Sequence, residues 1–181
     1  MTELFILLAV SLAVSAIGWK YFIYFFSLGY GYGIAALAVT MVIMFNNVIT
    51  PPTIALCVLL FIFGCRLGTY LLVREKKASA YRKILYDPEL QKKKPLVAII
   101  SVWLFCALLY VAQVSPVAFR LANAANGVAV NELWAWIGAA IMLLGILLEA
   151  ISDAQKNAAK KQNPNASSIR DFIGLCVALT N

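Results

Sequence analysis

Five long runs of apolar residues, interrupted by few charges, constrain what this chain can fold into. They cover about residues 4–26, 31–45, 52–73, 95–114 and 133–152. A helix that crosses a bilayer needs about 20 mostly apolar residues. The runs are continuous, whereas the strands of a membrane barrel would alternate apolar and polar residues. The sequence therefore predicts an all-α, multi-pass transmembrane helix bundle with about five spanning helices.

The composition supports lipid as the surrounding solvent. Hydrophobic residues make up 63% of the 181 residues and charged residues 13%, against about 45–50% and about 25% in soluble domains. A soluble fold would expose the excess as large apolar patches. We therefore expect an integral membrane protein of the ER or the bacterial inner membrane, with the lipid bilayer as its partner.

The distribution of positive charge predicts the orientation. Eight of the fifteen Lys and Arg residues fall between Arg74 and Lys94, and the tail after residue 153 is also basic. Such clusters favour the cytoplasmic side and anionic lipid, and they argue against a nucleic-acid site. Because two spans separate them, both segments fit on one side. We expect the 74–94 loop and the C-terminal tail to be cytoplasmic and the N-terminus extracytoplasmic.

Local signals refine the domain organisation, with a transmembrane domain over residues 1–156 and a polar cytoplasmic tail over 157–181. A signal peptide is an alternative for the first run, because Val14–Ala16 would suit a peptidase. No Lys or Arg precedes Lys20, however, so a retained helix is preferred. The glycines of 29–33 predict a turn, and Ser115-Pro116 predicts an end or a kink.

Several kinds of site are disfavoured by composition. The chain has no histidine, which removes the commonest metal ligand and the commonest general base. Its four cysteines show no CxxC spacing, so we interpret them as small apolar residues and not as disulfides or metal ligands. No metal site is predicted, and the sequence identifies no catalytic residue.

Ionisable residues inside spans are functional candidates, because each costs several kcal/mol in lipid. Glu149, Asp153, Lys156 and Lys160 form one polar stripe on the fifth helix. For the two lysines, a solvated helix end with intrahelical ion pairs is an equally good explanation. That explanation suits Glu149 less well, because an apolar run surrounds it.

A second group, Arg66, Tyr70 and Arg74, lies at the spacing of helix turns on the third helix. Snorkelling toward the interface explains Arg74 easily and Arg66 only with strain. Gly64 and Gly68 flank Arg66 and suit close helix packing. Both polar groups fall in the predicted cytoplasmic leaflet, where arginine forks for phosphates and carboxylates for ribose hydroxyls would accommodate a nucleotide.

Residues 145–156, with the pattern Glu-x-x-x-Asp-x-Gln-Lys, resemble a segment of the steroid 5α-reductase superfamily, notably its uncharacterised DUF1295-type membrane proteins. Residues 66–74 resemble that superfamily's Arg-Leu helix, and the similarity covers about residues 21–175. After Leu175 the superfamily continues with an Arg-His-Pro-Asn-Tyr block that this sequence does not contain. The tail is therefore expected to correspond to the truncated start of the superfamily's C-terminal region.

The resemblance implies a membrane-embedded oxidoreductase in which NADPH reduces a C=C bond of a steroid or lipid enone. Glu149 and Asp153 would lie beside the cofactor, Arg66 and Lys160 would be phosphate-side candidates, and Tyr70 would be a cavity residue. Because the Arg-His-Pro-Asn-Tyr block is absent, one expectation is that the protein is an incomplete or inactive member of the superfamily. A non-enzymatic membrane scaffold or lipid-binding protein is the alternative, and a small transporter with a polar site near the midplane is a weaker one.

Overall fold

The structure, a computed structural model, describes residues 2–77 and 95–162, and this part of the chain is helical with short connections and no strand. The chain divides into two compact units, Met1–Ala139 and Ala140–Asn181. The first unit holds α1 (Thr2–Ser15), the 3₁₀ helices η1 (Ala16–Trp19) and η2 (Phe22–Phe25), α2 (Leu28–Met44), α3 (Pro51–Lys77) and α5 (Leu96–Ala125). Helix α6 (Glu132–Gln162) begins in the first unit and continues in the second.

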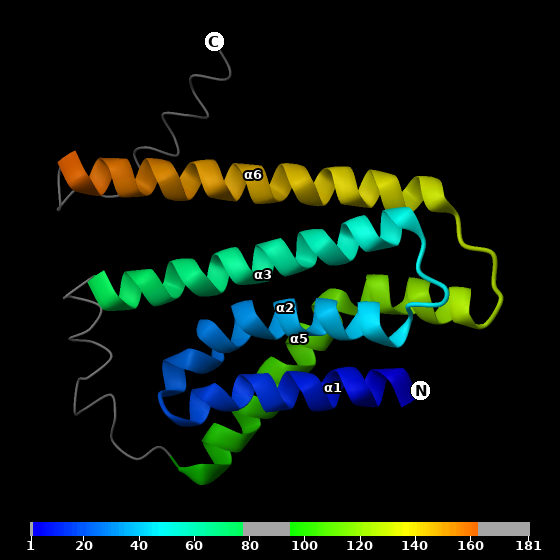
Figure 1. The fold of residues 1–181 in the computed structure, drawn as a ribbon. Coiled ribbons are helices and arrows are strands. Elements are labelled where there is room, and N and C mark those ends of the chain that lie inside the picture. The colour runs from blue at the N-terminus through cyan, green and yellow to red at the C-terminus, as the bar shows by residue number, and fades with distance from the viewer. Residues whose placement is uncertain (1, 78–94, 163–181) are drawn as a thin grey trace. The chain divides into compact units, whose positions relative to one another are not determined.

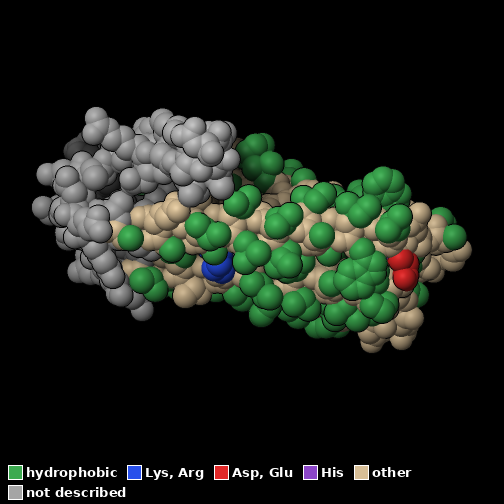
Figure 2. Space-filling model, turned by 90° about the horizontal axis from the view of Figure 1, so that it is seen from above, with side chains coloured by type: hydrophobic (Ala, Val, Ile, Leu, Met, Phe, Trp, Pro, Cys, Tyr) green, Lys and Arg blue, Asp and Glu red, His purple; other side chains and the backbone are tan. Residues whose placement is uncertain are grey.

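The helices have the lengths and surfaces of membrane-spanning elements. In the described ranges, five segments are long and apolar enough to cross a bilayer. Large apolar side chains point outward, including Ile43 at 68% and Val97 at 75% exposure. Figure 2 shows hydrophobic side chains over most of the described surface that faces the viewer. The protein is therefore an integral membrane helix bundle, as its composition predicts.

The connections within the first unit follow the alternation expected of successive spans. The N-terminus, the α2–α3 connection and the α5–α6 connection lie at one end, and the turns between α1 and α2 lie at the other (Figure 1). Arg120 joins the first turn of α3 to the α5–α6 connection. Its Nε donates to Oγ1 of Thr53 over 3.0 Å, and its Nη1 donates to the carbonyl of Asn131 over 2.7 Å. Which end faces the cytoplasm remains a prediction.

The first span ends earlier than the predicted 4–26 helix. Helix α1 stops at Ser15, and two 3₁₀ helices follow before α2. The reversal is possible because Gly18 has no side chain, and the ring of Phe25 occupies the space that a Cβ atom would need. An unbroken helix through residue 26 would forgo this contact.

The glycines of 29–33 lie inside α2 and do not form the predicted turn, so α2 begins at Leu28 and not at 31. Helix packing explains them. A Cβ atom on Gly31 would lie 2.6 Å from the amide nitrogen of Gly68 and 2.9 Å from the carbonyl oxygen of Gly64. The backbones of α2 and α3 therefore touch, which confirms the packing role predicted for Gly64 and Gly68.

Helix α5 does not end at residue 114 but runs through Pro116 to Ala125, and it bends along its course (Figure 1). Proline has no N–H, so the carbonyl of Ala112 loses its usual helical donor. The hydroxyl of Ser115 donates to that carbonyl over 2.7 Å instead. This substitute bond satisfies the carbonyl inside the span, where water is absent. The connection to α6 is correspondingly shorter than the gap between the predicted 95–114 and 133–152 spans.

Two other helices also exceed their predicted ends. Helix α3 extends through Lys77 rather than 73, and α6 extends through Gln162 rather than 152. The polar residues at these ends continue the helices beyond the apolar runs, because a helix that leaves the bilayer can keep its backbone bonds in water. The rest of the 74–94 loop and of the 157–181 tail lies outside the described residues.

Candidate functional site

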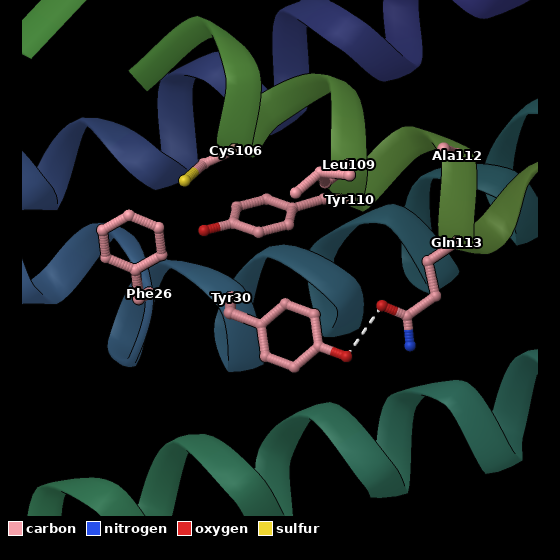
Figure 3. Close-up of a pocket in the computed structure, with 7 residues that line it drawn as sticks. All are labelled: Phe26, Tyr30, Cys106, Leu109, Tyr110, Ala112 and Gln113. Atoms are coloured by element: carbon pink, nitrogen blue, oxygen red, sulfur yellow. Dashed lines mark hydrogen bonds between the residues drawn. The ribbon is translucent and has the colours of Figure 1, made fainter. Parts of the chain in front are cut away.

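A cleft of about 450 Å³ lies between the N-terminal part of α2 and the middle of α5 (Figure 3). Its lining is mainly aromatic and aliphatic, with one amide and one thiol: Phe26, Tyr30, Cys106, Leu109, Tyr110, Ala112 and Gln113. A mostly apolar pocket with a few polar groups is the usual form of a small-molecule site.

The base of the cleft is built around Tyr110, which is 3% exposed. Its hydroxyl donates to the carbonyl of Phe25, at the end of η2. Its ring lies against α2 where Gly33 has no side chain, because a Cβ atom there would come within 3.1 Å of the ring. Cys106, one turn earlier on α5, is also buried. These contacts fix the base by joining η2, α2 and α5.

The rim of the cleft carries a hydrogen-bonded pair. The hydroxyl of Tyr30 donates to Oε1 of Gln113 over 2.7 Å. The ring of Tyr30 lies 5.5 Å from that of Tyr110 and 6.3 Å from that of Phe63 on α3, measured between centroids. Tyr30, which belongs to α2, therefore contacts both α3 and α5, and it positions the Gln113 amide at the mouth.

Gln113 is an exposed amide deep within a membrane span. At the helical rise, it lies about 25 Å along α5 from Leu96 and about 18 Å from Ala125. In the described part of the chain, Tyr30 is the only hydrogen-bond partner of its side chain. Its amide nitrogen is turned away from the Tyr30 hydroxyl (Figure 3). Two N–H donors are thus available where lipid tails offer no acceptor.

The described lining of the cleft is uncharged, since it contains no Lys, Arg, Asp or Glu. A buried charge without a partner is costly in an apolar environment. A charged ligand would therefore find no compensation at this site. The cleft suits a neutral molecule with an apolar body and a group that accepts hydrogen bonds.

Helix α1 supports α5 beside the cleft through polar contacts. The hydroxyl of Ser11 donates to the carbonyl of Ala107 over 3.0 Å. The indole nitrogen of Trp103 donates to Oγ of Ser15 over 3.0 Å and to the carbonyl of Leu12 over 3.1 Å. Hydrogen bonds between membrane helices stabilise their association. The α5 segment that lines the cleft is therefore held from two sides.

The residues predicted from the sequence belong to two groups. Arg66 and Tyr70 lie one turn apart on α3 and are half-buried, with the Nε and Nη2 atoms of Arg66 enclosed by protein. Glu149 and Asp153 lie one turn apart on α6, also half-buried. Lys160 belongs to α6, but its side chain lies outside the described residues. Since α3 and this part of α6 are in different units, a shared site remains a prediction.

Sequence reasoning missed the cleft. It considered ionisable residues within spans, and so passed over Tyr30, Tyr110 and Gln113. One signal was present, because Gln113 is the only amide side chain in the apolar run of α5 from 96 to 119. Among the described residues, Cys57, Cys65 and Cys106 have free thiols, and Cys57 and Cys106 are buried.

Comparison with known proteins gives one match. The family described as a protein of unknown function, DUF1295, matches residues 24–175, which include every lining residue of the cleft and most of the described helices. No curated protein and no solved structure matches the chain. The match covers more than half of the sequence and agrees with the resemblance carried by residues 66–74 and 145–156. The chain thus belongs to the DUF1295 family, a steroid 5α-reductase-like family.

Proposed function

We propose that the protein binds a neutral, lipid-like molecule in the cleft and reduces a C=C bond in it, with NADPH as the reductant. The observation that supports the binding site best is the Tyr30–Gln113 pair at the rim of an apolar cleft, deep within the spans. Membership in a steroid 5α-reductase-like family supports the reaction. A steroid or lipid enone is the substrate class that fits both the cleft and the reaction, because it has an apolar body, a carbonyl oxygen and a C=C bond.

The cleft's chemistry supports such a ligand. Its volume of about 450 Å³ falls within the usual range of small-molecule sites, about 300–1,000 Å³. The rings of Phe26, Tyr30 and Tyr110 would contact an apolar body. The amide nitrogen of Gln113 would donate to a carbonyl oxygen, with a net contribution of about 1 kcal/mol. Lipid excludes water from this depth, which strengthens a bond to the carbonyl.

The residues suggested for the cofactor have suitable chemistry. The carboxylates of Glu149 and Asp153 can accept hydrogen bonds from ribose hydroxyls, and the cations of Arg66 and Lys160 can bind phosphates. Tyr70 is the proposed residue of the substrate cavity. When bound, NADPH supplies the hydride, and the protein's own residues orient the cofactor and the lipid. This part of the proposal rests on the family resemblance.

The test uses the full chain in lipid nanodiscs. Addition of NADPH should raise its thermal unfolding temperature in a saturable manner, and Asp153→Ala should abolish this shift. Glu132→Ala, at the other end of α6, is the matched control and should keep it. With a long-chain enone present, NADPH should be consumed and the saturated ketone should form. No saturable shift, together with no effect of Asp153→Ala, would exclude the reductase proposal.

A second function, lipid binding without catalysis, is favoured by a separate observation. Every residue that lines the cleft lies in the first unit, and none belongs to the predicted cofactor group. Binding would therefore need only α2, η2 and α5. A saturable affinity for the enone without NADPH consumption would select this function over the reductase.

A further inference from the structure

The hydrogen bond between Tyr30 and Gln113 has a direction, and that direction determines what the rim offers to a ligand. The Tyr30 hydroxyl donates, so the amide oxygen of Gln113 faces Tyr30 and the amide nitrogen faces away (Figure 3). An amide that rotates freely can present either its donors or its acceptor. Gln113 with this partner presents its two N–H donors.

The hydroxyl of Tyr110, the other hydroxyl that lines the cleft, adds no hydrogen-bond donor for a ligand. Tyr110 donates its proton to the carbonyl of Phe25, so it has none left for a ligand. The thiol of Cys106 is a weak donor only. Among the described residues that line the cleft, the strongest donors open to a ligand are therefore the N–H groups of Gln113.

We propose that Tyr30 is a positioning residue that sets the ligand specificity of the cleft. By holding the Gln113 oxygen, it makes the rim a donor and selects a carbonyl oxygen over a hydroxyl group. This inference rests on the proposed function, because it assumes that the cleft binds a lipid-like molecule. A carbonyl only accepts hydrogen bonds, so the N–H groups satisfy it. A hydroxyl also carries a proton, and the phenol oxygens of Tyr30 and Tyr110 are weaker acceptors for it than the amide oxygen that Tyr30 holds, so burying that proton costs binding affinity.

The neighbourhood of Tyr30 supports a positioning role. Its ring is held between Tyr110 and Phe63, in tilted and edge-on contacts. Gly31, the next residue, packs against the α3 backbone and fixes this turn of α2. The hydroxyl of Tyr30 therefore has little freedom to follow Gln113 into another arrangement, and the amide must adapt to it.

The experiment compares two uncharged probes, a long-chain methyl ketone and the secondary alcohol of the same length. Their dissociation constants are measured in nanodiscs for the native protein, Tyr30→Phe, Gln113→Leu and Tyr32→Phe. Tyr32 is the matched control, since it lies on the same helix but packs its ring against Gly68. The native protein should prefer the ketone by about fivefold, the effect of one poorly satisfied hydroxyl.

Tyr30→Phe frees the amide to turn its oxygen outward, so the preference for the ketone should fall to about twofold or less. Tyr32→Phe should leave it unchanged. An unchanged preference in Tyr30→Phe, with ketone binding that Gln113→Leu weakens, would overturn the role of Tyr30 and leave the binding site intact. If Gln113→Leu binds the ketone as tightly as the native protein, the rim is not the polar anchor and the proposed binding site itself fails.

Discussion

The Tyr30 hydroxyl donates a 2.7 Å hydrogen bond to Oε1 of Gln113 and so links α2 to α5 inside the spans. A bond between two neutral side chains costs little to bury, and it leaves the amide nitrogen available. The pair combines a structural contact with a donor that lipid cannot satisfy. For this reason we place the candidate ligand site here.

Replacing Gln113 with leucine tests the polar anchor. The side chain is exposed, so Gln113→Leu removes the amide without disturbing the packing of the bundle. We expect ketone affinity to fall by about fivefold, which corresponds to the net contribution of about 1 kcal/mol of one hydrogen bond. The thermal unfolding temperature should change little, because the gain from leucine in lipid offsets the loss of the hydrogen bond to Tyr30. Equal losses of affinity and stability would indicate a structural role instead.

Replacing Gly31 with alanine tests the contact between α2 and α3. A Cβ atom would lie 2.6–2.9 Å from backbone atoms of Gly64 and Gly68, which cannot move without shifting α3. We expect Gly31→Ala to lower the free energy of unfolding by about 1–3 kcal/mol, as overpacking does.

The matched control for that substitution is Gly138→Ala. No described atom lies within 4 Å of a Cβ atom at this position. Thermal unfolding in nanodiscs should therefore leave Gly138→Ala unchanged or slightly more stable, since alanine favours helix. An equal effect of both substitutions would show that helix propensity, and not close packing, controls the result.

The substitute hydrogen bond of Ser115 can be tested with a double-mutant cycle. Ser115→Ala leaves the carbonyl of Ala112 without its donor and should cost about 1 kcal/mol. Pro116→Ala restores a backbone N–H to the same carbonyl, so Ser115→Ala should cost much less in that background. The coupling is measured from unfolding in denaturing detergent. Equal costs in both backgrounds would contradict the compensation.

The sequence predicted the class of fold and most of the spans, because long apolar runs leave few alternatives in a bilayer. It was wrong about a turn at Gly29–Gly33 and, of the end or kink predicted at Ser115-Pro116, about the end, and for one physical reason. In soluble proteins, clustered glycines usually mark turns and a proline usually marks a helix end. Here the glycines let α2 touch α3 and α5, and the Ser115 hydroxyl allows the helix to pass proline. These roles depend on neighbours far away in the sequence.

The candidate cleft was harder to predict, for a related reason. Tyr30 and Gln113 are separated by 83 positions and meet where α2 and α5 pack closely, with the Tyr110 ring against Gly33. Neither residue is charged, so neither has the large free-energy cost in lipid by which the candidate residues were selected from the sequence. In contrast, the charged candidates Arg66, Glu149 and Asp153 stand out in the sequence, and their shared site stays a prediction.

The orientation in the membrane is a further prediction. Single cysteines at Asn47 and Asn126, in the connections at one end of the first unit, should react with an impermeant maleimide from outside intact cells. A cysteine at Ser79, in the basic 74–94 loop, should react only after permeabilisation, because the positive-inside rule places this loop in the cytoplasm. The parent protein measures the background of its own thiols. Labelling of Ser79→Cys from outside would show that the orientation is the opposite of the predicted one.

Photo-crosslinking tests the central claim most directly. A long-chain ketone with a diazirine beside its carbonyl is irradiated with the nanodisc-embedded protein, and the modified residues are identified by mass spectrometry. Adducts should concentrate on the rim and base of the cleft, around Phe26, Tyr30 and residues 106–113. Excess unlabelled ketone should suppress them, and Gln113→Leu should reduce them. Adducts spread over the lipid-facing residues of all the helices, and insensitive to competitor, would contradict the cleft as a ligand site.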